Sequence, residues 1–341
     1  MAGSFTFKKP EPSGADTIKP FNLQSAEKPE PRNTLAEALR KSIKPCTELS
    51  TLGIPKREKV LGDWFMEGDL GFIFAPRGLG KTWVALGMAT AIAGGKACGP
   101  WQANGARQVL YVDGEMPVES IERRINGMGA VQSLFVLNHE ALFHLGNKTL
   151  NLADAATQDT ITDYALAAGI KVLILDNLSC LFSGVKENEA DGWEPVKRWF
   201  LTLRRHRISV ILVHHAGRNG EMRGTSKRED DVFWIIRLDE TSKDQRDGAQ
   251  FLSRFTKDRN SQKEQAPIEW QFTTLDSGAV DIVTREASSL DVFRQWIEDG
   301  LTSAEDIARE MNVSKGTVSK WARKAIEAGW LTKAGRGYAL A

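Results

Sequence analysis

The chain has few cysteines, no long hydrophobic run and almost no net charge. Its three cysteines, Cys46, Cys98 and Cys180, form no Cys-x-x-Cys pair and have no histidine cluster near them. This pattern excludes the common zinc-binding spacings and a disulfide framework, and it fits a reducing cytoplasm. No apolar run approaches the roughly 18 residues that span a bilayer, and the N-terminus lacks an apolar signal region. We therefore expect a soluble cytoplasmic protein with no membrane partner.

The net charge of +1 comes from 45 basic and 44 acidic residues. The whole-chain charge therefore favours no class of partner, and any surface that binds nucleic acid has to be local. With 41% hydrophobic and 26% charged residues, the composition is typical of a folded protein that buries a core. The length of 341 residues predicts two domains and a tail.

Residues 1–33 combine few large apolar side chains with five prolines, Pro10, Pro12, Pro20, Pro29 and Pro31. Such a segment cannot bury enough apolar surface to offset the entropy lost on ordering, so we predict a disordered N-terminal arm over these residues. Phe5, Phe7 and Phe21 are unusual in a purely solvated tail. They leave open a second role for the arm, which is docking onto a neighbouring subunit.

From residue 69 onward, short apolar runs alternate with helical patterns. The apolar runs predict buried strands at residues 70–74, 108–112, 171–175 and 209–213. Helices are predicted between and after them, at residues 82–93, 118–128, 155–168 and 193–205. This alternation predicts an α/β fold, in which a parallel sheet has helices on both faces. Looser patterns predict antiparallel strands added at one edge, at residues 232–238, 251–256, 268–272 and 280–283.

A glycine-rich loop connects the first predicted strand to the first predicted helix. Its glycines, Gly78 and Gly80, allow backbone N–H groups to surround phosphate oxygens, and the helix N-terminus favours an anion. Lys81 is placed for the β- and γ-phosphates, and the Thr82 hydroxyl for Mg²⁺. The usual first glycine of this motif is Ala75 here, and an ordinary strand–loop–helix connection is the alternative. The predicted ATP-binding residues are Ala75, Pro76, Arg77, Gly78, Leu79, Gly80, Lys81 and Thr82.

Acidic residues follow two other predicted strands. Asp176 ends an apolar strand, as a carboxylate that holds Mg²⁺ through water requires, although it could also cap a helix. Asp113 and Glu115 follow the strand at residues 108–112, where a carboxylate can polarise the attacking water. We expect Glu115 to act, with Asp113 as the second choice. All these motifs lie at carboxyl ends of strands, where open α/β sheets bind ligands.

The ordered motifs resemble those of a known ATPase family. After the glycine-rich loop come LYVDGEMP at residues 110–117, VLILDNLSCLF at residues 172–182 and VILVHHAGR at residues 210–218. Over about residues 61–283 this order resembles the RecA-like ATPases close to the hexameric plasmid replication helicase RepA, which are related to DnaB-type replicative helicases. The resemblance implies a RecA-like P-loop NTPase domain, which we place at residues 34–285. It also implies that Glu115 is the catalytic glutamate and Asp176 the metal-binding acid.

The same resemblance implies two further functions. A residue that senses the γ-phosphate corresponds to His215, with His214 as the competing choice, although both histidines could simply be partly buried hydrogen-bonding groups. A basic residue from the neighbouring subunit completes such sites, and Lys257 and Arg259 are the candidates, although a solvated strand end is the alternative. Arg223 lies in a loop that in relatives faces the central channel or the nucleotide, and a plain surface loop is equally compatible.

The pattern changes near residue 286, where a small second domain is predicted at residues 286–341. Helices are predicted at residues 290–298, 303–311 and 314–328, followed by a hairpin at residues 332–340. This order resembles a winged helix-turn-helix with residues 314–328 as the recognition helix. The candidate DNA contacts are Lys315, Thr317, Lys320, Arg323, Lys324 and Arg336. Docking onto a protein is the alternative use of such a domain.

These features lead to one functional expectation and two alternatives. We expect an ATP- and Mg²⁺-dependent DNA motor, a RepA-like helicase or translocase of a plasmid, phage or mobile element. It would form a homo-oligomeric ring, a hexamer in the related helicases, with single-stranded DNA in the ring and duplex DNA at the winged helix. The first alternative is an ATP-dependent DNA-binding switch that regulates, loads or adapts without unwinding. The second is a P-loop kinase for a small molecule, which the position of Glu115 disfavours.

Overall fold

The computed structural model describes residues 3–6, 34–184, 190–215, 230–240, 248–263, 265–298, 300–311 and 313–341. The chain divides into two compact units, Pro10–Arg57 and the combination of Met1–Lys9 with Glu58–Ala341. The first unit contains helix α1 (Leu35–Ser42), which Thr34 and Glu37 cap reciprocally, and a 3-10 helix at Cys46–Leu52. None of the residues in these two helices is buried.

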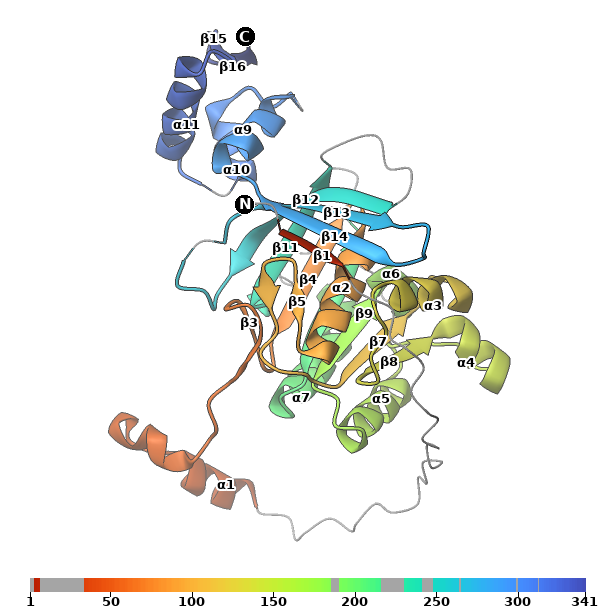
Figure 1. Ribbon diagram of the computed structural model, residues 1–341. Helices are drawn as coiled ribbons and strands as arrows, with labels where there is room; N and C mark the ends of the chain where they lie inside the picture. The colour runs from red at the N-terminus through yellow and green to blue at the C-terminus, as the bar shows by residue number, and fades with distance from the viewer. Residues whose placement is uncertain are drawn as a thin grey trace. The chain divides into compact units, whose positions relative to one another are not determined.

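A ten-stranded sheet forms the centre of the larger unit, in the order β1-β14-β13-β12-β11-β4-β10-β9-β7-β8 (Figure 1). Six consecutive strands are parallel, namely β11 (Trp234–Glu240), β4 (Leu70–Ala75), β10 (Ser209–His215), β9 (Val172–Asp176), β7 (Val109–Asp113) and β8 (Leu134–Asn138). Antiparallel strands extend the sheet beyond β11, namely β12 (Gly248–Asp258), β13 (Ile268–Thr274) and β14 (Val280–Glu286). The predicted parallel core and antiparallel edge are therefore both present.

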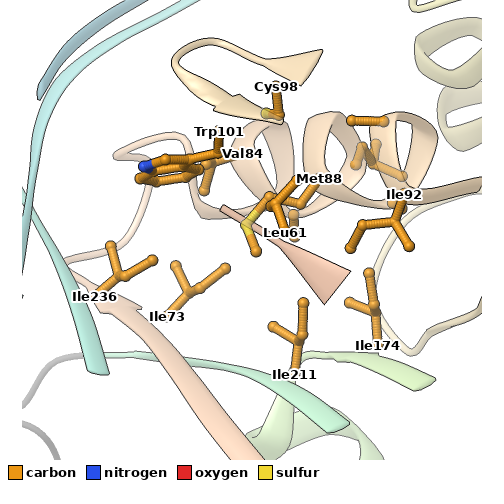
Figure 2. Packing of buried hydrophobic residues seen from close by; sticks show 14 of the residues in the cluster. Leu61, Ile73, Val84, Met88, Ile92, Cys98, Trp101, Ile174, Ile211 and Ile236 are labelled. Carbon is orange, nitrogen blue, oxygen red and sulfur yellow. The ribbon is translucent and has the colours of Figure 1, made fainter. Parts of the chain in front are cut away.

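Helices cover both faces of the sheet, because adjacent residues of each buried strand point to opposite sides. Ile73 belongs to a core cluster with α2 (Lys81–Gly94) and α3 (Val118–Gly127), whereas its neighbour Phe72 belongs to a cluster with α5 (Ala155–Ala167) and α7 (Ala190–Arg205). Figure 2 shows the first cluster, in which side chains of α2 face the strand isoleucines Ile73, Ile174, Ile211 and Ile236. The predicted two-sided helical cover is confirmed.

Three parts of the sheet differ from the sequence predictions. Strand β11 was expected in the antiparallel set, but it runs parallel to β4, and its consecutive buried residues Trp234, Ile235 and Ile236 are typical of a parallel strand covered on both faces. Strand β8 and helix α4 (His139–Gly146) were not predicted, because β8 is a half-exposed edge strand with a weak pattern. The loop that carries Arg223 lies outside the described residues.

Four residues of the expected disordered arm are ordered. Gly3–Thr6 forms strand β1, which pairs antiparallel with β14 in a register that places Gly3 opposite Thr284. The outer edge of β14 offers unpaired backbone groups, and β1 satisfies them. The prediction of disorder is corrected at these residues, while residues 7–33 lie outside the described part of the chain. Among the described helices, none has the length and apolar character needed to cross a lipid bilayer.

Residues near the C-terminus form three helices, α9 (Ser289–Glu298), α10 (Ala304–Glu310) and α11 (Lys315–Glu327), and a hairpin of β15 (Leu331–Ala334) and β16 (Gly337–Leu340). They share a small core that includes Phe293, Ile307, Val318, Ala322 and Leu331. Two arginines of the large sheet, Arg237 and Arg254, each lie 5.1 Å from the ring of Trp296 in α9. Arg254 also donates to the carbonyl of Glu310, at 2.6 Å.

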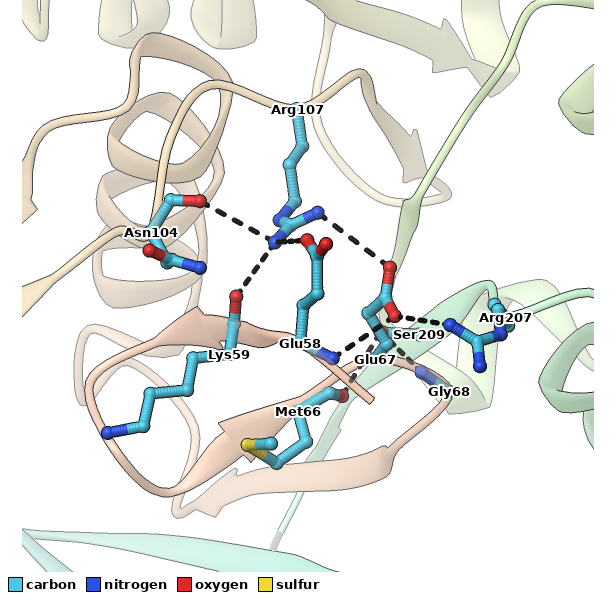
Figure 3. A network of polar contacts seen from close by, with 9 residues as sticks. All are labelled: Glu58, Lys59, Met66, Glu67, Gly68, Asn104, Arg107, Arg207 and Ser209. Atoms are coloured by element: carbon cyan, nitrogen blue, oxygen red, sulfur yellow. Dashed lines mark hydrogen bonds and ion pairs between the residues drawn. The ribbon is translucent and has the colours of Figure 1, made fainter. Parts of the chain in front are cut away.

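A largely buried ion-pair network holds the amino-terminal side of the sheet (Figure 3). Glu67 is 10% exposed at its side chain, and it pairs with Arg207 at 3.0 Å and with Arg107 at 3.8 Å. Arg107 in turn pairs at 3.0 Å with Glu58, whose side chain is 62% exposed. Removing one partner of a buried pair leaves an uncompensated charge, whereas an exposed pair contributes little.

We predict that Glu67→Gln destabilises the protein far more than Glu58→Gln does. The first variant leaves Arg107 and Arg207 without their shared buried carboxylate, and it should lower the free energy of unfolding by about 3 kcal/mol. The second removes an exposed partner of Arg107, and it should cost about 1 kcal/mol or less. Urea unfolding of the two variants measures the difference. Equal losses of stability would contradict this description of the network.

Candidate functional site

The glycine-rich loop lies between β4 and α2, at the carboxyl end of the parallel strands. Gly78 and Gly80 have φ angles of 79° and 87°, in the left-handed region that favours glycine. At Gly80, a Cβ atom would lie only 2.7 Å from the ring of Phe251 and 2.8 Å from the side chain of Ala249. Both the backbone conformation and the lack of space for a side chain therefore require glycine at position 80. The residues that leave no space belong to β12, which packs against the loop.

Alanine replaces the usual first glycine of the loop without a conformational penalty. Ala75 is the last residue of β4, fully buried and paired with His215 of β10. Among the described residues other than glycine, only Asn147 and Arg207 have a positive φ, so the backbone at Ala75 accepts any L-residue. The loop geometry that the sequence left in question is therefore compatible with alanine.

Lys81 begins α2 and points back toward the loop. Its Nζ donates to the carbonyls of Ala75, at 3.1 Å, and Pro76, at 2.6 Å. Burial lowers the pKa of Lys81 to about 8, and the nearby carboxylates Asp176 and Glu115 oppose this shift. An ammonium group held in this position can compensate the charge of a bound phosphate.

One cavity of about 230 Å³ brings most of the predicted ATP-site residues together. It is lined by the loop and the start of α2, by the turn after β7, and by the ends of β9 and β10. Its lining residues are Gly78, Leu79, Gly80, Lys81, Thr82, Trp83, Glu115, Met116, Arg124, Asp176, Asn177 and His215. The glycine amides, the lysine and the oxygen ligands fit a triphosphate with Mg²⁺.

Asp176 lies at the floor of this cavity. Burial raises the pKa of its carboxyl group, and hydrogen bonds from Tyr111 and Thr82 oppose that shift. The Tyr111 hydroxyl donates to Asp176 Oδ2 at 2.6 Å. Thr82 and Asp176 thus bring two oxygen ligands of the kind that Mg²⁺ prefers into contact, and a bound cation would favour the ionised carboxylate.

The structure separates the two acids that follow β7. Glu115 is exposed and lines the cavity, where its carboxylate accepts a hydrogen bond from the side-chain amide of Asn177. Asp113 is fully buried, and it accepts hydrogen bonds from the backbone N–H groups of Glu115 and Met116. Burial raises the pKa of Asp113 to about 6, against the effect of these bonds. Because Asp113 does not line the cavity, Glu115 is the acid that can reach a bound nucleotide.

The two histidines that end β10 are likewise distinct. His215 is partly exposed and lines the cavity, level with Ala75 on the neighbouring strand. His214 is buried and points to the opposite face, as alternation along a strand requires. The geometry therefore favours His215 over His214 as a residue that contacts the γ-phosphate.

Lys257 and Arg259 lie near the amino-terminal end of the parallel strands, whereas the cavity lies at their carboxyl end. Because β12 runs antiparallel to β11, its carboxyl end lies near the start of β4: Lys257 pairs with Ile235, which pairs with Phe72. The guanidinium of Arg259 is exposed and donates to the carbonyl of Asp230. Neither residue lines the cavity of its own subunit, so their role toward a neighbouring subunit stays a prediction.

The cavity contains a second cation, Arg124, that was not predicted from the sequence. Arg124 of α3 lies 4.6 Å from the ring of Trp83, the residue that follows Thr82 on α2. Ile121 and Ile125 place the buried stripe of α3 against the core, so Arg124 next to that stripe faces the loop. The predicted helix that begins at Val118, three residues after Glu115, was a signal that could have indicated this arginine.

The candidate DNA contacts all lie in the C-terminal helices and hairpin, and none of them lines the cavity. Those exposed at the surface are Lys315, Lys320, Arg323, Lys324 and Arg336. Lys315 pairs with Glu305 at 3.0 Å, and Thr317 is partly buried, with its hydroxyl 2.9 Å from the hydroxyl of the N-cap Ser314. The exposed set is therefore available for phosphate contact, whereas Thr317 also serves the helix cap.

Comparison with known families gives one match. The family AAA_25, described as an AAA domain, matches residues 43–221, which include the glycine-rich loop, Glu115 and Asp176. No curated protein matches the chain. The parallel sheet and the family match support a RecA-like P-loop ATPase, as the sequence resemblance implied.

Two solved structures are similar to parts of the chain. The flagellar accessory protein FlaH from Methanocaldococcus jannaschii is 14% identical, over 60% of this chain and 85% of its own, with a TM-score of 0.43. A KaiC-like protein from Pyrococcus horikoshii OT3 is 14% identical, over 66% of this chain and 97% of its own, with a TM-score of 0.46.

We predict that nucleotide affinity falls as the pH rises through about 8. Lys81 carries its positive charge below its pKa of about 8 and loses it above, so binding of a non-hydrolysable ATP analogue should be about tenfold weaker at pH 9 than at pH 7. Lys81→Arg is the control, because a guanidinium stays charged across this range, and its affinity should not change with pH. An affinity of the unsubstituted protein that is equal at both pH values would contradict this role of Lys81.

Proposed function

Because the chain belongs to the AAA_25 family of AAA domains, we propose that it is an ATP-hydrolysing motor that acts on DNA as a ring of identical subunits. The observation that carries the proposal is the single cavity that joins Lys81, Thr82 and Asp176 to an exposed carboxylate, Glu115. Phosphate binding, metal binding and water activation each have a residue there.

Each residue of the cavity has a part in the proposed reaction. The amides of the loop and Lys81 bind the phosphates, and Arg124 adds a second positive charge. Thr82 and Asp176 would hold Mg²⁺, which would neutralise charge that develops on the phosphate oxygens. Glu115 orients a water molecule and accepts its proton as the water attacks the γ-phosphorus. The bond between the γ-phosphorus and the bridging oxygen breaks, and ADP leaves with that oxygen, while Asn177 holds the Glu115 carboxylate.

The location of Lys257 and Arg259 supports the proposed ring. Both residues lie near the amino-terminal end of the parallel strands, away from the cavity of their own subunit, and Arg259 is exposed there. In a ring of identical subunits packed head to tail, one surface of each subunit faces a different surface of the next. We infer that Lys257 and Arg259 complete the neighbouring cavity, as the resemblance to RepA-like helicases implies.

The C-terminal helices and hairpin supply the second half of the proposal. Their order matches a winged helix-turn-helix, in which α11 would be the recognition helix and the β15–β16 hairpin the wing. Lys320 and Arg323 lie on the same exposed side of α11, and Arg336 extends the basic surface to the hairpin. A surface of this kind is suited to the phosphates of DNA.

A DNA-binding switch that hydrolyses ATP without unwinding is the competing function. It needs the same cavity and the same basic helix, so the two functions differ only in what hydrolysis does. A strand-displacement assay distinguishes them, because only the motor separates a duplex at the expense of ATP. From the resemblance to RepA-like helicases, we also propose that the protein comes from a plasmid, a phage or another mobile element.

We predict that two inactive variants restore activity when they are mixed. Lys81→Ala removes phosphate binding from its own cavity but keeps Arg259, whereas Arg259→Ala keeps its own cavity but removes the cation offered to a neighbour. Each should hydrolyse ATP at least tenfold more slowly than the unsubstituted protein, since lost charge stabilisation typically costs this much. In mixed rings, the Lys81→Ala subunit supplies Arg259 to an intact cavity, and the ATPase rate should recover in part.

The matched control is a mixture of Lys81→Ala with Glu115→Gln. Each of these variants has a defective cavity and both retain Arg259, so neither should restore the activity of the other. ATPase rates of the two mixtures, measured after joint refolding or subunit exchange, give the comparison. Full activity of Arg259→Ala alone, or no recovery with Lys81→Ala, would contradict action across subunits. Full activity of Glu115→Gln alone would contradict the assignment of the catalytic acid.

A further inference from the structure

The turn that carries Glu115 is held by two buried polar side chains outside the cavity. Asp113 and Asn138 are the last residues of β7 and β8, and the parallel register places them opposite each other. The side-chain amide of Asn138 donates to Asp113 Oδ2 at 2.6 Å and to the carbonyl of Met116 at 2.8 Å. Asp113 is fully buried, and Asn138 is 4% exposed.

Asp113 fixes the start of this turn. Its Oδ1 accepts hydrogen bonds from the N–H groups of Glu115 and Met116, both at 3.3 Å, and its Oδ2 accepts a further bond from Met116 at 3.2 Å. An aspartate side chain that accepts hydrogen bonds from the backbone N–H groups two and three residues later stabilises a turn by itself. The backbone direction at Glu115 is therefore set by a carboxylate that does not itself touch the cavity.

The end of the turn is fixed by the same network. The Oδ1 of Asn138 accepts bonds from the N–H groups of Glu140 and Ala141, which begin α4. The carboxylate of Glu140 then accepts a bond at 2.7 Å from the N–H of Val118, the first residue of α3. Strand β8 and helix α4 thus hold the chain on both sides of Glu115, although neither lines the cavity.

We propose that Asp113 and Asn138 are positioning residues, which hold the turn so that the Glu115 carboxylate reaches the attacking water. The proposal rests on the proposed ATP hydrolysis with Glu115 as the acid that activates water. A shift of about 1 Å in a reacting group can cost roughly a hundredfold in rate, so the support of an exposed carboxylate on a turn has a measurable effect.

A purely structural role for the pair explains less. Apolar side chains at the ends of β7 and β8 would pack the two strands without the cost of burying a carboxylate and an amide. The hydrogen bonds of the pair go to the turn and to the two helix starts rather than to other side chains of the core. Its specific contribution is therefore the geometry of the turn.

The test uses Asn138→Leu and the more conservative Asp113→Asn, each in the full-length chain. Asn138→Leu removes the amide that donates to Asp113 and to the Met116 carbonyl. Asp113→Asn places a second amide opposite that of Asn138, so that two N–H donors compete where a donor faced an acceptor. We expect each variant to lower kcat for ATP by about 10- to 100-fold. The KM for ATP and the affinity for a fluorescent ATP analogue should stay within about twofold, because the phosphate-binding loop is untouched.

The double exchange Asp113→Asn with Asn138→Asp separates the bond between the two side chains from their bonds to the turn. The new amide at position 113 donates to the new carboxylate at position 138, but a carboxylate cannot donate to the Met116 carbonyl, so this bond to the turn stays lost. We therefore expect kcat to stay within about threefold of that of Asp113→Asn alone, whereas a role confined to the bond between the two side chains would restore it. Gln158→Leu is the matched control: it deletes a buried amide that donates to the Leu152 carbonyl, far along the chain from this turn, and should lower Tm without lowering kcat.

Two results would overturn the proposal. One is an unchanged kcat in Asn138→Leu or Asp113→Asn. The other is a loss of kcat that is matched by the loss of nucleotide affinity, as a general loss of structure would give, or that the double exchange recovers, as a bond between the two side chains alone would give. Glu115→Gln, measured alongside, separates this proposal from the one it rests on. If Glu115→Gln is inactive while Asn138→Leu is fully active, only the positioning role fails; if Glu115→Gln hydrolyses ATP at full rate, both fail.

Discussion

The candidate site depends above all on the parallel register of β4, β10, β9 and β7. This register pairs Ala75 with His215 and Asp113 with Asp176, so that the four strands end side by side. Each strand end then contributes a different group: the glycine-rich loop, a histidine, a buried aspartate and a turn with an exposed glutamate. Because side chains alternate along a strand, a shift of one residue would exchange His215 for the buried His214.

Much of this arrangement could be predicted from the sequence, since it depends on local patterns. Continuous apolar runs predicted the buried parallel strands, and the positions of Lys81, Asp176 and Glu115 at or shortly after the ends of these strands predicted the candidate site. The same local information gave the helices of the C-terminal region. At Ala75 the motif was imperfect, and the structure explains why: this residue ends an extended strand, where glycine is not needed.

What the sequence could not supply comes from neighbours distant along the chain. Strand β11 is parallel because it lies beside β4, and β1 is ordered because β14 offers it a free edge; neither partner is evident from local pattern. Asn138 supports Glu115 from the adjacent strand β8, and Arg124 reaches the cavity from a helix face. The separation of Glu115 from Asp113 likewise depends on burial, because both acids follow β7 in the same short segment.

We propose that the cavity hydrolyses ATP in an assembly of subunits that responds to DNA. The most direct test is the ATPase rate per subunit, measured over a range of protein concentrations with and without single-stranded DNA, together with the mass of the assembly. We expect a rate that rises with concentration as the ring forms and rises again when DNA is added. A constant rate from a stable monomer, indifferent to DNA, would contradict it.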